Sequence, residues 1–256
     1  MTVSYADNKI AQVLAYQPII GIKEIEQMNY PDIIKRLKAL SDPKAVEGMA
    51  RYGINPDNTY GVSMPNLRKM AKEIGINHAL AQQLWASGIH EAKILATLVE
   101  DVNMVTEEQV ESWVGDFDSW DVCDQCCINL LRNTRFAYVK AAEWSSREQE
   151  FVKRAGFVLM ACLVVSDKKE DNTKFEKFLP IIKREASDNR IYVKKAVNWA
   201  LRQIGKRNLY LNRKAIATAR EILEIDSKSA RWIASDAIRE LTSQAIQQRL
   251  KNLKKL

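Results

Sequence analysis

Apolar residues recur at spacings of three and four along most of this chain, and no stretch keeps the two-residue alternation of a half-buried strand. Such spacing places apolar side chains on one face of a helix. We expect long helices over residues 147–165, 173–185 and 189–205, with shorter ones between and around them. The chain has only nine Gly and six Pro in 256 residues, so its connections should be short. The pattern predicts an all-α fold.

A faint internal repeat narrows that class. The sequence Val-Lys-Arg-Ala at 152–155 returns as Val-Lys-Lys-Ala at 193–196, an offset of 41, and Ala-Leu-Arg at 200–202 returns as Ala-Ile-Arg at 237–239, an offset of 37. Offsets near 40 with two helices in each period are typical of HEAT-like repeats, which stack into a curved α–α superhelix. We therefore predict a C-shaped solenoid with a concave groove; an ordinary helical bundle with chance similarity is the alternative.

The same pattern sets the domain organisation. We interpret residues 1–256 as a single HEAT-like repeat domain. Residues 1–30 are set apart as a loosely attached N-terminal helical segment.

Charge is unevenly distributed along the sequence. Residues 1–150 hold 15 Lys and Arg against 21 Asp and Glu, whereas residues 151–256 hold 24 against 11. A basic half of this kind is the electrostatic footprint expected for binding a polyanion, which favours a basic groove and nucleic acid. A solvated, Lys-rich helical surface is the other explanation.

The cysteines do not favour a metal site. Cys123 and Cys126 have metal-ligand spacing, but the chain has only two His and no second Cys pair at that spacing. We expect all four cysteines to be small buried residues, and we expect neither metal nor cofactor.

Two features bear on location. No run of about 18 apolar residues exists, so we expect no membrane partner. The N-terminus lacks the basic start and apolar run of a signal peptide. We predict a cytoplasmic protein, associated with a bacterial nucleoid when acting.

Two helical stripes carry the candidate site. Trp120 and Asp124 are four residues apart and share one helix face. Lys195, Trp199 and Arg202 follow at i, i+4 and i+7, off the apolar stripe of their helix. A carboxylate beside an indole suits a site that stabilises positive charge, and a stripe of cations around a Trp suits phosphates and an exposed base or sugar.

Five segments in one order resemble the DNA alkylation repair family, specifically its AlkD-type HEAT-like DNA glycosylases. They are Met-Ala-Arg-Tyr at 49–52, Gly-Val-Ser-Met-Pro-Asn-Leu-Arg at 61–68, Ser-Trp-Asp-Val-Cys-Asp at 119–124, Phe-Val-Lys-Arg-Ala at 151–155 and Val-Lys-Lys-Ala-Val-Asn-Trp-Ala-Leu-Arg at 193–202. The resemblance implies a metal-independent, monofunctional alkylpurine glycosylase that hydrolyses the N-glycosidic bond of cationic N3- or N7-alkylated purines in duplex DNA.

The resemblance also implies roles for individual residues. Asp124 matches the catalytic carboxylate, and Trp120 and Trp199 match aromatic residues at the lesion. Arg154 matches a basic residue beside the lesion's phosphate, and Tyr52 an aromatic near the site. We add the neighbouring basic residues to the expected DNA-binding set, namely Lys153, Lys194, Lys195 and Arg202. The chain departs from the best-known members at Ser119, where they carry a further Trp, in its Cys-rich 121–127 stretch and in the distinctive segment 229–236.

The expected chemistry is simple. A purine alkylated at N3 or N7 is already cationic and leaves readily, so a second carboxylate acting as general acid is not required. Asp124 would stabilise the developing oxocarbenium charge and orient the attacking water. Asp121 is the alternative carboxylate, although it does not stand i+4 from Trp120.

Structural explanations exist for each of these residues. Asp124 can instead cap a helix or pair with an Arg, Trp120 can pack between repeats, and Tyr52 can be an ordinary packing residue. His78 and His90 show no partner pattern and are expected to be surface or packing residues.

Three functions are therefore compared: the alkylpurine glycosylase, a non-catalytic HEAT-like protein that binds distorted or branched DNA, and a HEAT scaffold that binds protein. For the first we expect duplex DNA carrying alkylated bases as partner, no obligate protein partner, and a monomer.

Overall fold

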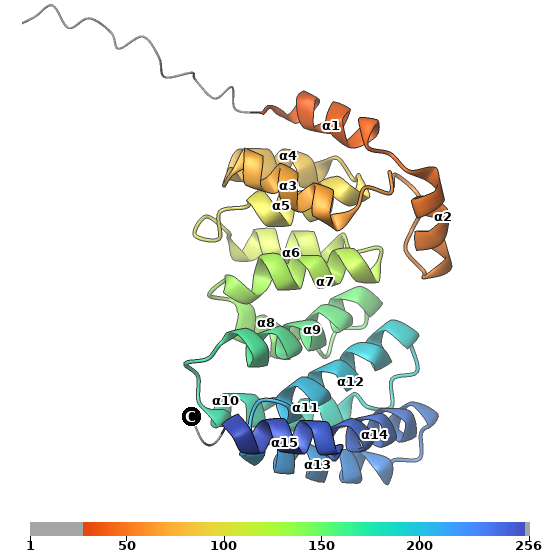
Figure 1. Ribbon diagram of the computed structural model, residues 1–256, viewed down its shortest axis with the longest axis vertical. Helices are drawn as coiled ribbons and strands as arrows, with labels where there is room; N and C mark the ends of the chain where they lie inside the picture. The colour runs from red at the N-terminus through yellow and green to blue at the C-terminus, as the bar shows by residue number, and fades with distance from the viewer. Residues whose placement is uncertain (1–27, 254–256) are drawn as a thin grey trace, which may run out of the picture.

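The computed structural model describes residues 28–253, and every regular element in that range is helical (Figure 1). Residues 1–27, most of the predicted N-terminal segment, lie outside the described part. The α-helices are α1 (Tyr30–Ala39), α2 (Pro43–Arg51), α3 (Met64–Ile74), α4 (His78–Ala86), α5 (His90–Val99), α6 (Glu107–Gly115), α7 (Trp120–Asn129), α8 (Ala137–Trp144), α9 (Glu150–Ser166), α10 (Asn172–Glu176), α11 (Phe178–Arg184), α12 (Ile191–Gly205), α13 (Leu209–Leu223), α14 (Lys228–Leu241) and α15 (Gln244–Leu253); a 3-10 turn, η1, covers Leu131–Asn133.

The helices form two rows. Helices α3, α5, α7, α9, α12 and α14 contact one another in succession, and we call them the main row. The flanking row packs on it through the pairs α4–α5, α8–α9 and α13–α14. Figure 1 shows the stack running from α1 at one end to α13, α14 and α15 at the other. This repeated pairing confirms the all-α, HEAT-like repeat predicted from the spacing.

Aromatic and charged contacts tie the flanking row together. Trp85 of α4 stacks flat on Trp113 of α6, with ring centroids 4.1 Å apart. Trp144 of α8 then donates its indole N–H to Glu111 of α6 over 2.9 Å. Helices α4, α6 and α8 are thus joined in succession by contacts of large aromatic side chains.

One predicted helix is wrong in its length. Residues 173–185 were expected to form one helix, but α10 ends at Glu176 and α11 begins at Phe178, with Lys177 between them. The break turns Phe175 and Phe178 onto the Tyr138 ring of α8, at centroid distances of 6.4 and 6.2 Å. An apolar stripe alone did not reveal this, because both phenylalanines suit a continuous helix.

The loop between α2 and α3, residues 52–63, crosses the edge of the main row, and we call it the strap. The Glu91 carboxylate at the start of α5 anchors its end by accepting hydrogen bonds from the backbone N–H groups of Tyr60, Gly61 and Val62. Its middle is held by Asn55, which donates to Asp118 over 3.0 Å. Helix α2 buries none of its residues and lies beside the stack in Figure 1. The strap therefore positions α2 rather than the reverse.

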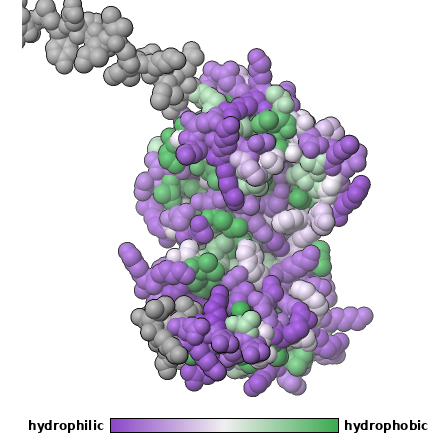
Figure 2. Space-filling view, in the orientation of Figure 1, coloured by the Kyte–Doolittle hydropathy of each residue, from purple (hydrophilic) through white to green (hydrophobic). Residues whose placement is uncertain are grey.

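The outer surface of the stacked helices is mostly hydrophilic. Figure 2 shows hydrophilic residues over most of the visible face, with apolar patches scattered among them. Within residues 28–253, none of the helices has the length and apolar character needed to cross a bilayer.

Candidate active site

Helix α7 brings the two predicted residues to one edge of the main row. Trp120 is its first residue and Asp124 its fifth, so the indole and the carboxylate lie one turn apart on one face. The opposite face carries Val122 and Cys126, which are completely buried. Packing of that face fixes the rotation of the helix and holds Asp124 at the rim, 9% exposed.

Arg154 of α9 grips the Asp124 carboxylate. Its Nε and Nη2 each donate to a different carboxylate oxygen over 2.8 Å, and its Nη1 donates to the main-chain oxygen of Tyr192 at the start of α12 over 2.6 Å. The guanidinium carbon also lies 5.9 Å from the centroid of the Trp120 ring, within cation–π range. Three neighbouring helices of the main row therefore meet at one guanidinium, and Asp124 has a single fixed orientation.

Burial and the opposite charge of the partner have opposing effects on the pKa of Asp124 and on that of Arg154. Burial raises the pKa of Asp124 above its ordinary value, and the Arg154 charge offsets only part of this effect. Burial also disfavours the charged form of Arg154, but the Asp124 carboxylate outweighs it and the guanidinium pKa is raised. Asp124 is thus a carboxylate whose charge depends on its partner.

Trp120 is held by the strap. Its indole N–H donates to the main-chain oxygen of Tyr52 over 3.0 Å, while the Tyr52 side chain is 75% exposed. The structure thus brings Tyr52 to the site through its carbonyl group, with the phenol turned to solvent. Next to it, the Tyr192 hydroxyl donates to the main-chain oxygen of Gly53 over 3.4 Å.

His90 and Asp121 form a second pair beside the first. The His90 Nε2 lies 2.9 Å from an Asp121 carboxylate oxygen, and His90 is 5% exposed. Burial lowers the pKa of His90, but Asp121 and the nearby Glu91 and Asp118 carboxylates outweigh it, so the net pKa is raised above 6.5. His90 is a buried residue, within the expectation of a surface or packing role, but both histidines have partners that the sequence pattern did not show. The Nδ1 of His78 lies 2.6 Å from a Glu100 carboxylate oxygen. Asp121, the alternative carboxylate, is occupied by the pairing with His90.

Trp199 and Lys195 lie further along α12. Trp199 is half-buried against the core, two turns after Tyr192 on the same helix face. In the described part of the chain no hydrogen bond, ion pair, ring stack or cation–π contact joins Trp199 to Trp120, Asp124 or Arg154. Lys195 is exposed one turn before Trp199. The sequence predicted that these two residues share a stripe of their helix, and their spacing on α12 agrees with this.

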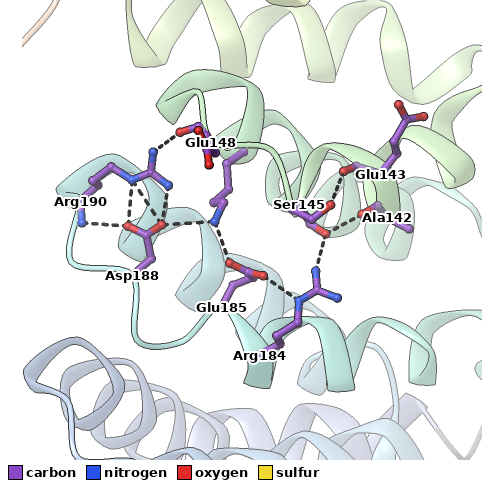
Figure 3. Close-up of polar contacts among 10 residues, drawn as sticks. Ala142, Glu143, Ser145, Glu148, Arg184, Glu185, Asp188 and Arg190 are labelled. Carbon is purple, nitrogen blue, oxygen red and sulfur yellow. Dashed lines mark hydrogen bonds and ion pairs between the residues drawn. The ribbon is translucent and has the colours of Figure 1, made fainter.

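The other basic residues of the predicted DNA-binding set differ in their partners. Arg202 forms ion pairs with Asp236 and Glu240 of α14. Lys153 lies 2.7 Å from Glu185 and 3.5 Å from Asp188. Figure 3 shows how Asp188 and Glu185 in turn hold Arg190 and Arg184 around this network. Lys153 and Arg202 therefore carry little unpaired charge.

The cysteines and the His, Asp and Glu side chains are the residue types that could bind a metal. All four cysteines are buried thiols, as expected, and burial raises the pKa of Cys126 and Cys127. Over residues 28–253, no group of three or more His, Cys, Asp or Glu side chains is arranged to hold a metal ion.

The decisive comparison is with a protein family. The family model described as "DNA alkylation repair enzyme" matches residues 33–241, which covers nearly all of the stacked helices. The chain belongs to the DNA alkylation repair enzyme family. This confirms the family resemblance read from the five segments.

Two curated relatives of this family member are uncharacterized proteins. Lin0241 of Listeria innocua is 25% identical over 135 residues, and Lmo0209 of Listeria monocytogenes is 24% identical over 135 residues. Both matches cover 51% of this chain and 60% of the relative.

A solved structure shares the fold. It is described as belonging to a new family of proteins related to the HEAT-like repeat DNA glycosylases with affinity for branched DNA structures. The TM-score is 0.70 at 21% identity, and the match covers 83% of this chain and 95% of that one.

Sequence reasoning missed two parts of this family member's site. The strap contributes through backbone carbonyl groups, which have no sequence signal. The pairing of His90 with Asp121 joins residues 31 apart in sequence and on different helices. Helical spacing gives no signal for a pairing between two helices.

Proposed function

We propose that this protein is a monofunctional DNA glycosylase that releases cationic N3- or N7-alkylated purines from duplex DNA without a metal. The observation that carries the proposal is the Asp124 carboxylate, held by both oxygens in the Arg154 fork and flanked by the Trp120 indole. A fixed carboxylate with one edge at the surface fits a reaction whose transition state develops positive charge on a sugar.

The reaction would proceed as follows. The alkylated purine leaves with the electrons of the glycosidic bond and becomes neutral, so no proton donor is needed. The sugar acquires oxocarbenium character beside Asp124, and the Trp120 ring face adds a cation–π contact worth about 0.5–2 kcal/mol. Water, oriented by Asp124, adds to the anomeric carbon and loses its proton to that carboxylate or to solvent.

Arg154 serves two purposes in this proposal. Its fork favours the charged form of Asp124 against the effect of burial. The guanidinium also has N–H groups beyond the three that bind Asp124 and Tyr192, and these suit a phosphate oxygen of the DNA backbone. Trp199 and Lys195 would contact the strand next to the lesion.

The test is release of free base from duplex DNA that carries 7-methylguanine or 3-methyladenine. Wild type should release the base, and Asp124→Asn should lose at least about a hundredfold in rate while still binding the duplex. Glu221→Gln is the matched control, because its side chain is 57% exposed on α13 of the flanking row. Loss of release in both variants, or in neither, counts against Asp124 as the carboxylate.

A second candidate is a non-catalytic reader of distorted or branched DNA. Both Asp124 oxygens accept hydrogen bonds from Arg154, and an ion pair of this kind also suits a purely structural carboxylate. The description of the similar solved structure favours the same function. Tight DNA binding by wild type with no base release would support this candidate.

Salt dependence separates both candidates from a protein-binding scaffold. Residues 151–256 carry 24 Lys and Arg against 11 Asp and Glu. If they contact phosphates, affinity for duplex DNA falls steeply as salt is raised, because condensed counterions are released on binding. A flat response would favour the scaffold.

A further inference from the structure

Four helices of the main row, α7, α9, α12 and α14, carry notable residues at the same position counted from the start of the helix. Asp124, Arg154, Lys195 and Trp232 are each the fifth residue of their helix. The steps from Arg154 to Lys195 and from Lys195 to Trp232 are 41 and 37 residues, the two repeat offsets of the sequence. Since adjacent helices of this row contact each other, these equivalent positions lie on successive helices from the candidate carboxylate on α7 to Trp232 on α14.

Trp232 is unusual for a residue in the last helix pair. It is 43% exposed, and the Lys194 Nζ lies 5.1 Å from its ring centroid. Lys228, one turn earlier on α14, is exposed on the same face. An exposed indole with a lysine over its ring does not serve core packing, because the inward side of α14 is filled by Ile233, Ala234 and Ala237.

The basic residues near Trp232 differ in whether a carboxylate pairs with them. Among the described residues, Lys194, Lys195 and Lys228 make no ion pair, whereas Lys153, Arg202 and Lys206 each bind a carboxylate. Arg231 beside Trp232 pairs with Asp226, and Arg239 pairs with Asp236. Three lysines close to Trp232 therefore keep positive charge that no carboxylate of residues 28–253 pairs with and that is available for a polyanion.

We propose that Trp232, with Lys194 and Lys228, is a stacking site for an unpaired base, so that the DNA bound by this protein has a single-stranded segment adjoining its duplex. The proposal rests on DNA being the ligand, as in the proposed function. Inside a duplex both faces of each base are covered by neighbouring bases, so away from the duplex ends an indole can stack only on a base that has left the helix. The two lysines would hold the phosphates on either side of that base.

The experiment compares two DNA ligands in a fluorescence anisotropy titration: a blunt duplex, and the same duplex with a single-stranded arm. Wild type should bind the forked DNA more tightly. Trp232→Ala should weaken binding of the fork by about tenfold, the loss expected for one base–aromatic stack, and leave blunt duplex nearly unchanged. Trp232→Phe, which keeps an aromatic face, should retain most of the affinity.

Tyr210→Ala provides the matched control. Tyr210 is also 43% exposed and has a lysine, Lys214, 5.5 Å from its ring centroid, but it belongs to α13 of the flanking row. This variant should bind both ligands like wild type. Equal losses for fork and blunt duplex in Trp232→Ala, or no loss for either, would overturn the proposal; unchanged DNA binding with altered self-association would assign Trp232 to a protein contact instead.

Failure of the stacking site and failure of the proposed function are distinguishable. If wild type releases alkylated base but Trp232→Ala binds forked DNA normally, only the stacking site is wrong. If wild type binds neither DNA ligand, the proposed function fails as well.

Discussion

The indole N–H of Trp120 donates to the main-chain oxygen of Tyr52 over 3.0 Å, although the two residues are 68 positions apart. A side chain of the candidate site therefore takes its orientation from the strap. Next to that carbonyl, Gly53 has a φ of 75° and almost no free space, since an added Cβ would lie 1.7 Å from the Tyr192 hydroxyl oxygen.

Substitution of Gly53 by Ala should displace the strap and lower base release. The added methyl group collides with Tyr192, and the backbone conformation costs about 1–2 kcal/mol for a residue with a Cβ. Gly88→Ala is the control, because Gly88 has a φ of 68° with no atom within 4 Å of the added Cβ. Both variants should unfold at lower temperature, and only Gly53→Ala should lose activity. Equal activities would show that the strap does not orient the site.

Replacement of Arg154 by Gln should move the acidic limb of the pH–rate profile. The active form of Asp124 is the carboxylate, so activity falls as pH drops through its pKa, which burial already holds above the ordinary value. Loss of the neighbouring positive charge should raise that pKa further, and the limb should move to higher pH with it. Arg154→Lys should move it less. The measurement is kcat/KM for base release over a pH series, and an unmoved limb would mean that Asp124 is not the titrating group.

The pairing of His90 with Asp121 should make stability depend on pH. Because the pKa of His90 in the folded chain is raised above 6.5, the stabilisation is complete below about pH 6.5 and is lost as pH rises through the folded pKa. Urea unfolding of wild type and His90→Gln should therefore give a larger difference in unfolding free energy at about pH 5.5 than at about pH 8.5. A difference that is the same at both pH values would contradict a charged pair.

Two glycine-to-alanine substitutions should have opposite effects on stability. An added Cβ at Gly156 of α9 would lie 2.6 Å from the Ser145 backbone N and 2.9 Å from the Ala141 carbonyl oxygen, so helices α8 and α9 must separate. We expect a loss of about 1–3 kcal/mol. At Gly48 of α2 nothing lies within 4 Å, and Ala should gain about 0.5–1 kcal/mol from its better helix propensity. Chemical denaturation of both variants checks the pair.

The elements most accurately predicted from sequence are those set by local spacing. The long helices α9 and α12 follow from apolar stripes, and Trp120 and Asp124 share a face because they stand four residues apart on α7. These features need only the geometry of a single helix. The repeat offsets also predicted that helix pairs stack on one another, because the repeated residues can be recognised directly in the sequence.

The remaining features depend on which side chains meet across repeats. Arg154 reaches Asp124 over 30 residues, and Lys153 reaches Glu185 over 32. Helical spacing does not fix such distances, so a lysine expected to bind phosphate and a lysine bound to a carboxylate are alike in sequence. Trp199 is an instructive case, because its stripe on α12 follows from spacing while its position relative to Asp124 on α7 depends on how both helices pack on α9.

The strap has a final consequence for folding. Units of a solenoid ordinarily contact only their neighbours, so the array can fray from either end. Here the Tyr192 hydroxyl donates to the main-chain oxygen of Gly53, which lies 139 residues earlier in the sequence. The Trp120 indole donates to the main-chain oxygen of Tyr52, the residue before Gly53. The first helices therefore cannot melt alone without releasing contacts made by α7 and α12, and unfolding of the terminal repeats is coupled cooperatively to the middle of the array.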